Sequence, residues 1–258
     1  MPWKMIAFRD KWSSLGCAWR RSPAESAERY EGSLSKTIVA ATAIGQRGER
    51  HMHDEWEHAR RLLREAGVAG WKDLGLFVNN TDYFRPSAFD ERAAMPVLLD
   101  LLPTLTDRSL VMAVAGHLRR RWARPRALPV LHAAFVSWAG RDQHVGWAIG
   151  DALVTCGQVA DLPTLLDLAA ERRYGWSRQM IVDAPLWRFK KDDRVGTLLL
   201  ELIDDPDVAL HAMGALRRVL GNGDALPHLR RVRDAHPEPR VREQAKQHVR
   251  RAESKANR

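Results

Sequence analysis

The residues best suited to chemistry stand together in residues 51–58. His51, His53, Asp54 and His58 carry imidazole and carboxylate groups, the side chains that bind Zn²⁺ and other transition metals. On a helix, Asp54 and His58 would share one face, because residues four apart lie one turn from each other. A metal site needs three or four converging ligands with supporting groups, and the sequence shows no second group of ligands. We therefore interpret the cluster as a polar, solvated helix and predict no metal, no cofactor and no catalytic residue.

Other catalytic motifs are missing from the sequence. It contains no glycine-rich phosphate loop, no Gly-x-Ser-x-Gly nucleophile turn and no paired metal-ligand motif. Two cysteines, Cys17 and Cys156, stand far apart and form neither a metal pair nor a disulfide framework. No apolar run reaches the roughly 18 to 20 residues that cross a bilayer, and no secretion signal opens the chain. We expect a cytoplasmic protein without enzymatic activity, and the sequence predicts no oligomeric state.

Basic side chains are concentrated at the two ends of the chain, whose net charge is +9. Lys and Arg outnumber Asp and Glu by 9 to 5 in residues 1–50 and by 12 to 5 in residues 217–258, whereas residues 51–216 hold 20 against 22. A protein that follows nucleic acid along its whole length would spread cations over its body, because phosphates repeat along the helix axis. The C-terminal cluster fits an acidic protein surface, RNA or an anionic membrane, and equally a solvated terminal cap.

The elements that must position these residues repeat along the chain. A phrase of an apolar residue, Pro, any residue and Leu, with Gly for Pro in one copy, occurs at 95–98, 128–131, 162–165, 195–198 and 226–229. The second residues of successive phrases are 33, 34, 33 and 31 positions apart. A regular period of this size indicates an array of stacked repeats.

Each repeat is expected to be a pair of helices. Apolar residues recur every four positions after four of the phrases, which is the pattern of a helix with one buried face. These residues are Leu110, Val114, Leu118, Val145, Ile149, Leu153, Val208, Ala212, Leu216, Val241, Ala245 and Val249. The residues expected to cap these second helices are Asp107, Asp142, Ser177 and Asp205. The prolines expected near the starts of first helices are Pro96, Pro129, Pro163 and Pro227.

The run from Asp205 to Leu229, with its restart at residues 238–242, resembles the short HEAT-like repeats of phycobilin lyases. The resemblance covers residues 91–253 and implies an all-α superhelix, a solenoid of about five helical hairpins. The signature phrases of tetratricopeptide and ankyrin repeats are absent. The third repeat differs, because Pro185 falls inside its expected second helix and predicts a kink or break at residues 183–184.

Four segments are predicted. Residues 1–48 are expected to be poorly structured or partly helical, and residues 49–90 to form a helical cap and connector, with a helix that ends at Gly67. Residues 91–253 form the HEAT-like repeats, and residues 254–258 a basic tail.

Second helices line the concave side of HEAT-like solenoids, so the resemblance implies partner contacts at exposed positions there. The expected positions are Arg119, Trp147, Asp151, Arg178, Arg217 and Arg242. The favoured function is a non-enzymatic scaffold that binds a protein partner, one with an acidic surface. The alternative is a nucleic-acid-binding module that uses Arg120, Arg121, Arg230, Arg231, Arg233 and Arg240.

One enzymatic hypothesis belongs to that alternative. Trp147, Asp151 and Trp187 are similar in type to the Trp and Asp side chains that helical-repeat DNA glycosylases use on alkylated bases. The resemblance implies that all three would be exposed on one surface near Arg178 and Arg188. Packing roles for the two tryptophans are the favoured interpretation.

Overall fold

The structure is a computed structural model that describes residues 53–75, 88–183 and 189–256. All regular structure within these ranges is helical, and no strand occurs in them. The chain divides into two units, Met1–Arg50 and His51–Arg258, and the described residues belong to the second. None of the helices in these ranges is long and apolar enough to cross a membrane. The predicted all-α class is confirmed for this part of the chain.

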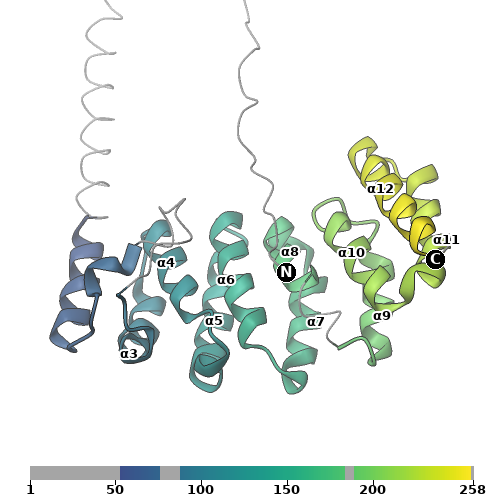
Figure 1. The fold of residues 1–258 in the computed structure, drawn as a ribbon. Helices are drawn as coiled ribbons and strands as arrows, with labels where there is room; N and C mark the ends of the chain where they lie inside the picture. The colour runs from purple at the N-terminus through teal and green to yellow at the C-terminus, as the bar shows by residue number, and fades with distance from the viewer. Residues whose placement is uncertain (1–52, 76–87, 184–188, 257–258) are drawn as a thin grey trace, which may run out of the picture. The chain divides into compact units, whose positions relative to one another are not determined.

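Ten helices of the described residues form five consecutive pairs (Figure 1). The pairs are α3 (Glu91–Leu101) with α4 (Arg108–Leu118), α5 (Arg124–Trp138) with α6 (Gln143–Cys156), α7 (Leu162–Ala170) with α8 (Gln179–Asp183), α9 (Asp193–Leu202) with α10 (Ala209–Val219), and α11 (Gly221–Ala235) with α12 (Pro239–Ala256). Short 3-10 helices stand beside them: η1 (Trp71–Gly75), η2 (Leu102–Thr104), η3 (Arg121–Ala123), η4 (Val159–Asp161) and η5 (Arg172–Arg178). The two members of every pair contact each other.

The second helices of successive pairs lie side by side in one row. Helix α4 contacts α6, α6 contacts α8, α8 contacts α10, and α10 contacts α12 (Figure 1). Every apolar residue predicted for the buried face of these helices is at most 2% exposed. That prediction is confirmed, and burial of these side chains supplies the main driving force for packing each pair against the next.

The predicted caps divide into two groups. Asp107 and Asp142 are N-caps of α4 and α6, and each carboxylate accepts a backbone N–H of the first turn. Asp205 instead closes a turn, because its Oδ1 accepts from the N–H of Asp207 and α10 begins four residues later, at Ala209. Ser177 is not a cap: it is buried within η5, where its hydroxyl lies 3.0 Å from the carbonyl oxygen of Ala139.

The proline prediction is correct in one repeat only. Pro163 is the second residue of α7, where its missing N–H has no helical partner. Pro96, Pro129 and Pro227 lie inside α3, α5 and α11, because those helices begin before the repeated phrase. In α3 the start is fixed by Asp90, whose side chain accepts from two backbone N–H groups. Each interior proline therefore removes one backbone hydrogen bond from its helix.

A helix over residues 53–65 covers the first pair. Its Glu55 accepts the backbone N–H of Asp107 at 2.9 Å, and the indole N–H of Trp56 donates to the Asp107 carboxylate at 3.2 Å. Ala59 and Leu63 of the same helix are fully buried. The helix ends before Gly67, whose φ of 70° is in the left-handed region that glycine adopts without strain.

Several predictions fall on residues outside those described. They include the whole segment 1–48, the connector around residues 76–87, and residues 184–188 with Pro185 and the expected kink. Helix α8 is described as far as Asp183. At the other end, α12 continues through Ala256, so residues 254–256 belong to this helix rather than to a separate tail.

Candidate anion-binding site

A polar pocket of the described residues lies between the last three helices. It has a volume of about 370 Å³. Its lining residues are Gly214, Arg217, Arg218, Asn222, His248, Arg251 and Ser254. Three arginines and the hydrogen-bonding side chains of Asn222, His248 and Ser254 thus surround a space that no acidic side chain lines, and such a lining favours an anion.

Helical spacing brings these side chains together. On α10, Gly214 is followed by Arg217 and Arg218 three and four positions later, which places all three on one face. On α12, His248 and Arg251 stand three residues apart in the same way. Helix α12 contacts both α10 and α11, and these contacts bring the faces together around the pocket.

The guanidinium of Arg217 is held in place by neutral partners. Its Nε and Nη2 both donate to the Asn222 side-chain oxygen, at 3.1 and 2.9 Å, and its Nη1 lies 3.4 Å from Nδ1 of His248. Because arginine has no acceptor atom, Nδ1 must accept, and the neutral imidazole then carries its proton on Nε2. These contacts fix the orientation of Arg217 without neutralising its charge.

The positive charge of the pocket is only partly balanced. Arg218 donates to the Asp183 carboxylate at 2.8 Å. Within the described ranges, no carboxylate lies at ion-pair distance from Arg217 or Arg251. A half-buried arginine beside two other arginines is unfavourable without a counter-ion, since like charges in a shielded site repel strongly.

This electrostatic environment also shows in the ionisation of the pocket residues. Burial and the neighbouring Arg251 and Arg218 lower the pKa of Arg217. Burial, followed by Arg217, Arg251 and Arg218, lowers the pKa of His248 to about 4, against which Asp183 acts weakly. His248 is therefore neutral at physiological pH. The pocket can bind an anion, but it offers no group poised for acid–base catalysis near pH 7.

The six positions expected to contact a partner are not gathered into one site. Arg119 and Asp151 form an ion pair with each other between α4 and α6, and Trp147 is 37% exposed on α6. Arg242 donates to the carbonyl oxygens of His236 and Pro237 and so stabilises the end of α11. Of the six, only Arg217 lines the polar pocket.

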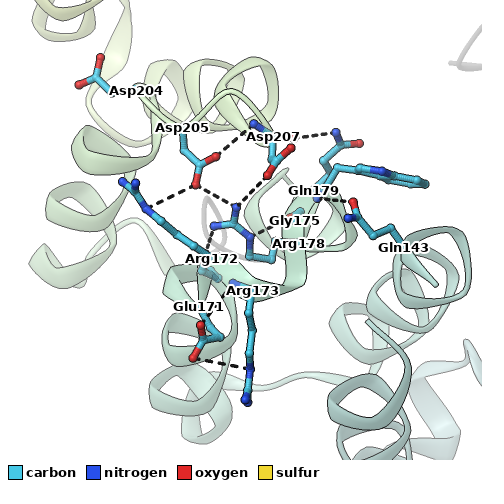
Figure 2. Close-up of polar contacts among 12 residues, drawn as sticks. Gln143, Glu171, Arg172, Arg173, Gly175, Arg178, Gln179, Asp204, Asp205 and Asp207 are labelled. Carbon is cyan, nitrogen blue, oxygen red and sulfur yellow. Dashed lines mark hydrogen bonds and ion pairs between the residues drawn. The ribbon is translucent and has the colours of Figure 1, made fainter. Parts of the chain in front are cut away.

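Arg178 was expected on the exposed surface, and this prediction is wrong. Its side chain is fully buried, and Nη2 donates to the Asp205 carboxylate at 2.9 Å (Figure 2). Its Nε and Nη1 donate to the carbonyl oxygens of Gly175 and Ala169. Each nitrogen of the guanidinium thus has an acceptor, which lets the charge lie inside the protein. The contact ties η5 to the turn before α10.

Most arginines of the nucleic-acid alternative have acidic partners. Arg120 pairs with Glu91. Arg230 pairs with Glu253, Arg231 with Asp204 and Arg233 with Asp234. Arg121 and Arg240 are exposed. The pairing lowers the positive potential that a phosphate backbone would meet at these positions.

The trio of the glycosylase hypothesis is only partly described. Trp187 and Arg188 lie outside the described residues, and the Asp151 carboxylate is already paired with Arg119. The proposed common surface of the three side chains is therefore not observed.

Sequence reasoning missed three polar lining residues, Asn222, His248 and Ser254, as well as Gly214. Arg217, Arg218 and Arg251 stood out as members of the basic C-terminal cluster, but nothing separated them from its other arginines. A usable signal was present in the spacing, because His248, Arg251 and Ser254 recur every three residues on one helix face. Polar residues at this spacing on the inner side of a terminal helix would have pointed to the pocket.

Comparison with known proteins gives no relative. No family model matches the chain, and no curated protein or solved structure is significantly similar to it.

Proposed function

We propose that this protein is a non-enzymatic scaffold, a HEAT-like solenoid that binds an acidic partner protein through its C-terminal helices. The regular row of second helices and the buried apolar residues on their faces support the solenoid. Such arrays commonly present extended surfaces to partners rather than enclosing a catalytic centre.

The observation that carries the proposal is the pocket between α10, α11 and α12. Here Arg217 and Arg251 bring two positive charges to one place without a carboxylate at ion-pair distance among the described residues. Arginine is also the basic residue most enriched at protein interfaces, because its planar group makes several directed hydrogen bonds while losing little hydration energy. An acidic surface would supply the missing counter-charges.

The arrangement supports a protein partner more than a nucleic acid. Continuous nucleic-acid binding needs cations along a path, and the arginines that would extend the path on α11, Arg230, Arg231 and Arg233, each pair with a carboxylate. Nucleic-acid binding, the alternative function, is a separate outcome of the test below.

The test measures fluorescence anisotropy of a labelled Asp- and Glu-rich peptide with the full-length protein over a salt series. Single- and double-stranded DNA and RNA of similar charge serve as competing ligands. We expect the peptide to bind and its affinity to fall with salt. Removing Arg217 and Arg251 together should weaken peptide binding by about tenfold or more.

A matched control removes the same charge elsewhere. The double variant Arg230→Ala/Arg233→Ala loses two arginines that are already paired, so it should change peptide affinity by less than about threefold. Equal losses in both double variants would mean that only net charge matters, and the proposal would be rejected. Tight binding of nucleic acid with a steep salt dependence, and none of the peptide, would establish the alternative instead.

A further inference from the structure

We propose that the pocket between α10, α11 and α12 binds a phosphate monoester, carried by a phosphorylated side chain of the partner. This inference rests on the scaffold function proposed above and names the chemical group that the scaffold recognises.

The hydrogen-bond donors of the pocket suit a tetrahedral oxyanion. Arg217 is fixed by Asn222 and His248 and still has N–H groups that no described residue accepts. Arg251 and Ser254 lie one turn apart on α12 and line the same space, and because the Ser254 hydroxyl donates to the Arg251 carbonyl oxygen at 3.2 Å, the donor that α12 supplies is the Arg251 guanidinium. Guanidinium groups bind phosphate oxygens in pairs, and such charge-assisted bonds are about twice as strong as neutral ones.

The charge of the pocket suits a dianion better than a carboxylate. A phosphate monoester carries a charge of about −1.5 to −2 at pH 7 and three strong acceptor oxygens. Arg217, Arg218 and Arg251 lie close enough to one another that the latter two lower the pKa of the first, and only Arg218 has a carboxylate partner among the described residues. A dianion would balance the two remaining charges, whereas one carboxylate would balance only one.

The size of the pocket points to an ester rather than to free phosphate. Its 370 Å³ falls within the range of about 300 to 1,000 Å³ that is usual for small-molecule sites. Glycine at position 214 keeps one wall free of a side chain. Arg251 and Ser254 are exposed, so the pocket opens to solvent along α12. A phosphate can therefore enter while the atoms that carry it remain attached to a larger molecule.

The pocket offers donors for one phosphate group only, which favours a phosphorylated protein over the backbone of a nucleic acid. Backbone phosphates are diesters with one charge each, and they recur at every nucleotide. The neighbouring arginines of α11 that could bind the next phosphates, Arg230 and Arg231, pair with Glu253 and Asp204. One dianionic group is what the pocket can accommodate.

The test titrates the full-length protein with inorganic phosphate, acetate, a phosphoserine peptide and its unphosphorylated counterpart by calorimetry at constant ionic strength. We expect phosphate to bind at least tenfold more tightly than acetate, and the phosphopeptide more tightly than inorganic phosphate. The imidazole NMR signals of His248 should shift on binding, because this ring contacts Arg217 at the pocket wall. Equal affinities for phosphate and acetate would overturn the proposal.

Two neighbouring arginines provide the control. Arg251→Ala removes a donor of the pocket, and Arg250→Ala removes the same charge from the adjacent residue, which is exposed and does not line the pocket. Both side chains lie at the surface, so both variants should fold. We expect Arg251→Ala to weaken phosphopeptide binding by about tenfold or more and Arg250→Ala by less than threefold. Similar effects of both would also overturn the site.

The outcomes separate this inference from the scaffold function. If the acidic peptide binds through Arg217 and Arg251 but phosphorylation adds nothing, the phosphate site is wrong and the scaffold stands. If phosphate binds through Arg251 and no acidic peptide is captured, the scaffold is wrong and the site stands. A 5′-phosphorylated oligonucleotide that binds more tightly than the phosphopeptide would keep the site but overturn the assignment to a partner protein.

Discussion

Replacing Arg178 should destabilise this protein more than replacing any other arginine that contacts Asp205. Figure 2 shows two arginines beside this carboxylate, Arg172 and Arg178. The Arg178 side chain is fully buried and lies 2.9 Å from Asp205 Oδ2, whereas the Arg172 side chain is 77% exposed and 3.9 Å away. Variants of these two arginines therefore compare a buried with an exposed contact to the same acceptor.

The expected magnitudes follow from burial. Removing one partner of a buried ion pair costs about 3 to 5 kcal/mol, because the other charge stays buried without a partner. Arg178→Ala would also leave the carbonyl oxygens of Ala169 and Gly175 without their side-chain donors. An exposed ion pair contributes about 0 to 1 kcal/mol, so Arg172→Ala should cost at most this much. For a domain of roughly 150 to 250 residues, each kcal/mol lowers Tm by about 2 to 4 °C.

The assay is thermal unfolding followed by far-ultraviolet circular dichroism. We expect Arg178→Ala to lower Tm by roughly 6 to 20 °C and Arg172→Ala by less than about 4 °C. Asp205→Asn keeps an oxygen that can accept the Asp207 N–H but removes the charge. The double variant Arg178→Met/Asp205→Asn should lose less stability than the sum of the losses in the two single variants, because the same ion pair is lost only once. Equal shifts for the Arg172 and Arg178 variants would refute the reasoning.

Three further predictions test packing and ionisation. A Cβ at Gly146 would lie 2.7 Å from the backbone of Ala139, whereas at Gly116 it would meet nothing. Gly146→Ala should therefore destabilise by about 1 to 3 kcal/mol and Gly116→Ala stabilise by about 0.5 to 1 kcal/mol, both measured by chemical denaturation. The pKa of His248, about 4 in the folded protein, is below the unfolded value of 6.5. The unfolded state thus binds the proton first, and stability should fall by about 3 kcal/mol as pH drops from 6.5 to 4, a loss that His248→Gln removes. Burial raises the pKa of the Cys156 thiol, so mass spectrometry should detect its alkylation at pH 8 only after unfolding.

The buried face of the second helices could be predicted because it depends on local periodicity. Leu110, Val114 and Leu118 recur at the helical period, and any partner helix that covers this face buries them. The starts of the first helices were less predictable. The Asp90 cap starts α3 ahead of Pro96, whereas α5 and α11 begin ahead of Pro129 and Pro227 without a side-chain cap.

The third pair contains tertiary contacts that local sequence patterns do not predict. Ser177 precedes an apolar stretch and reads locally as a cap, yet it lies in η5 and packs where Gly146 lets two elements approach closely. The backbone at Gly175 adopts a φ of 51°, a left-handed conformation that glycine tolerates and that follows from the surrounding packing rather than from the local sequence. Neither the close approach nor the turn has a periodic signal in the sequence.

The two arginines that matter most here, Arg178 and Arg217, look alike in the sequence, since both belong to predicted second helices and neighbour polar residues. Their partners distinguish them. Arg178 is the more buried of the two, but its contacts with Asp205 and two backbone carbonyls use each nitrogen of the guanidinium, so its role is structural. Arg217 is held by the neutral side chains of Asn222 and His248, which orient it and leave its charge unbalanced among the described residues. A positioned charge that lacks a counter-charge is costly to maintain for folding alone, and a bound anion would remove that cost. The chemistry of the hydrogen-bond partners, rather than exposure, thus distinguishes Arg178, which ties η5 to the turn before α10, from Arg217, which can bind an anion.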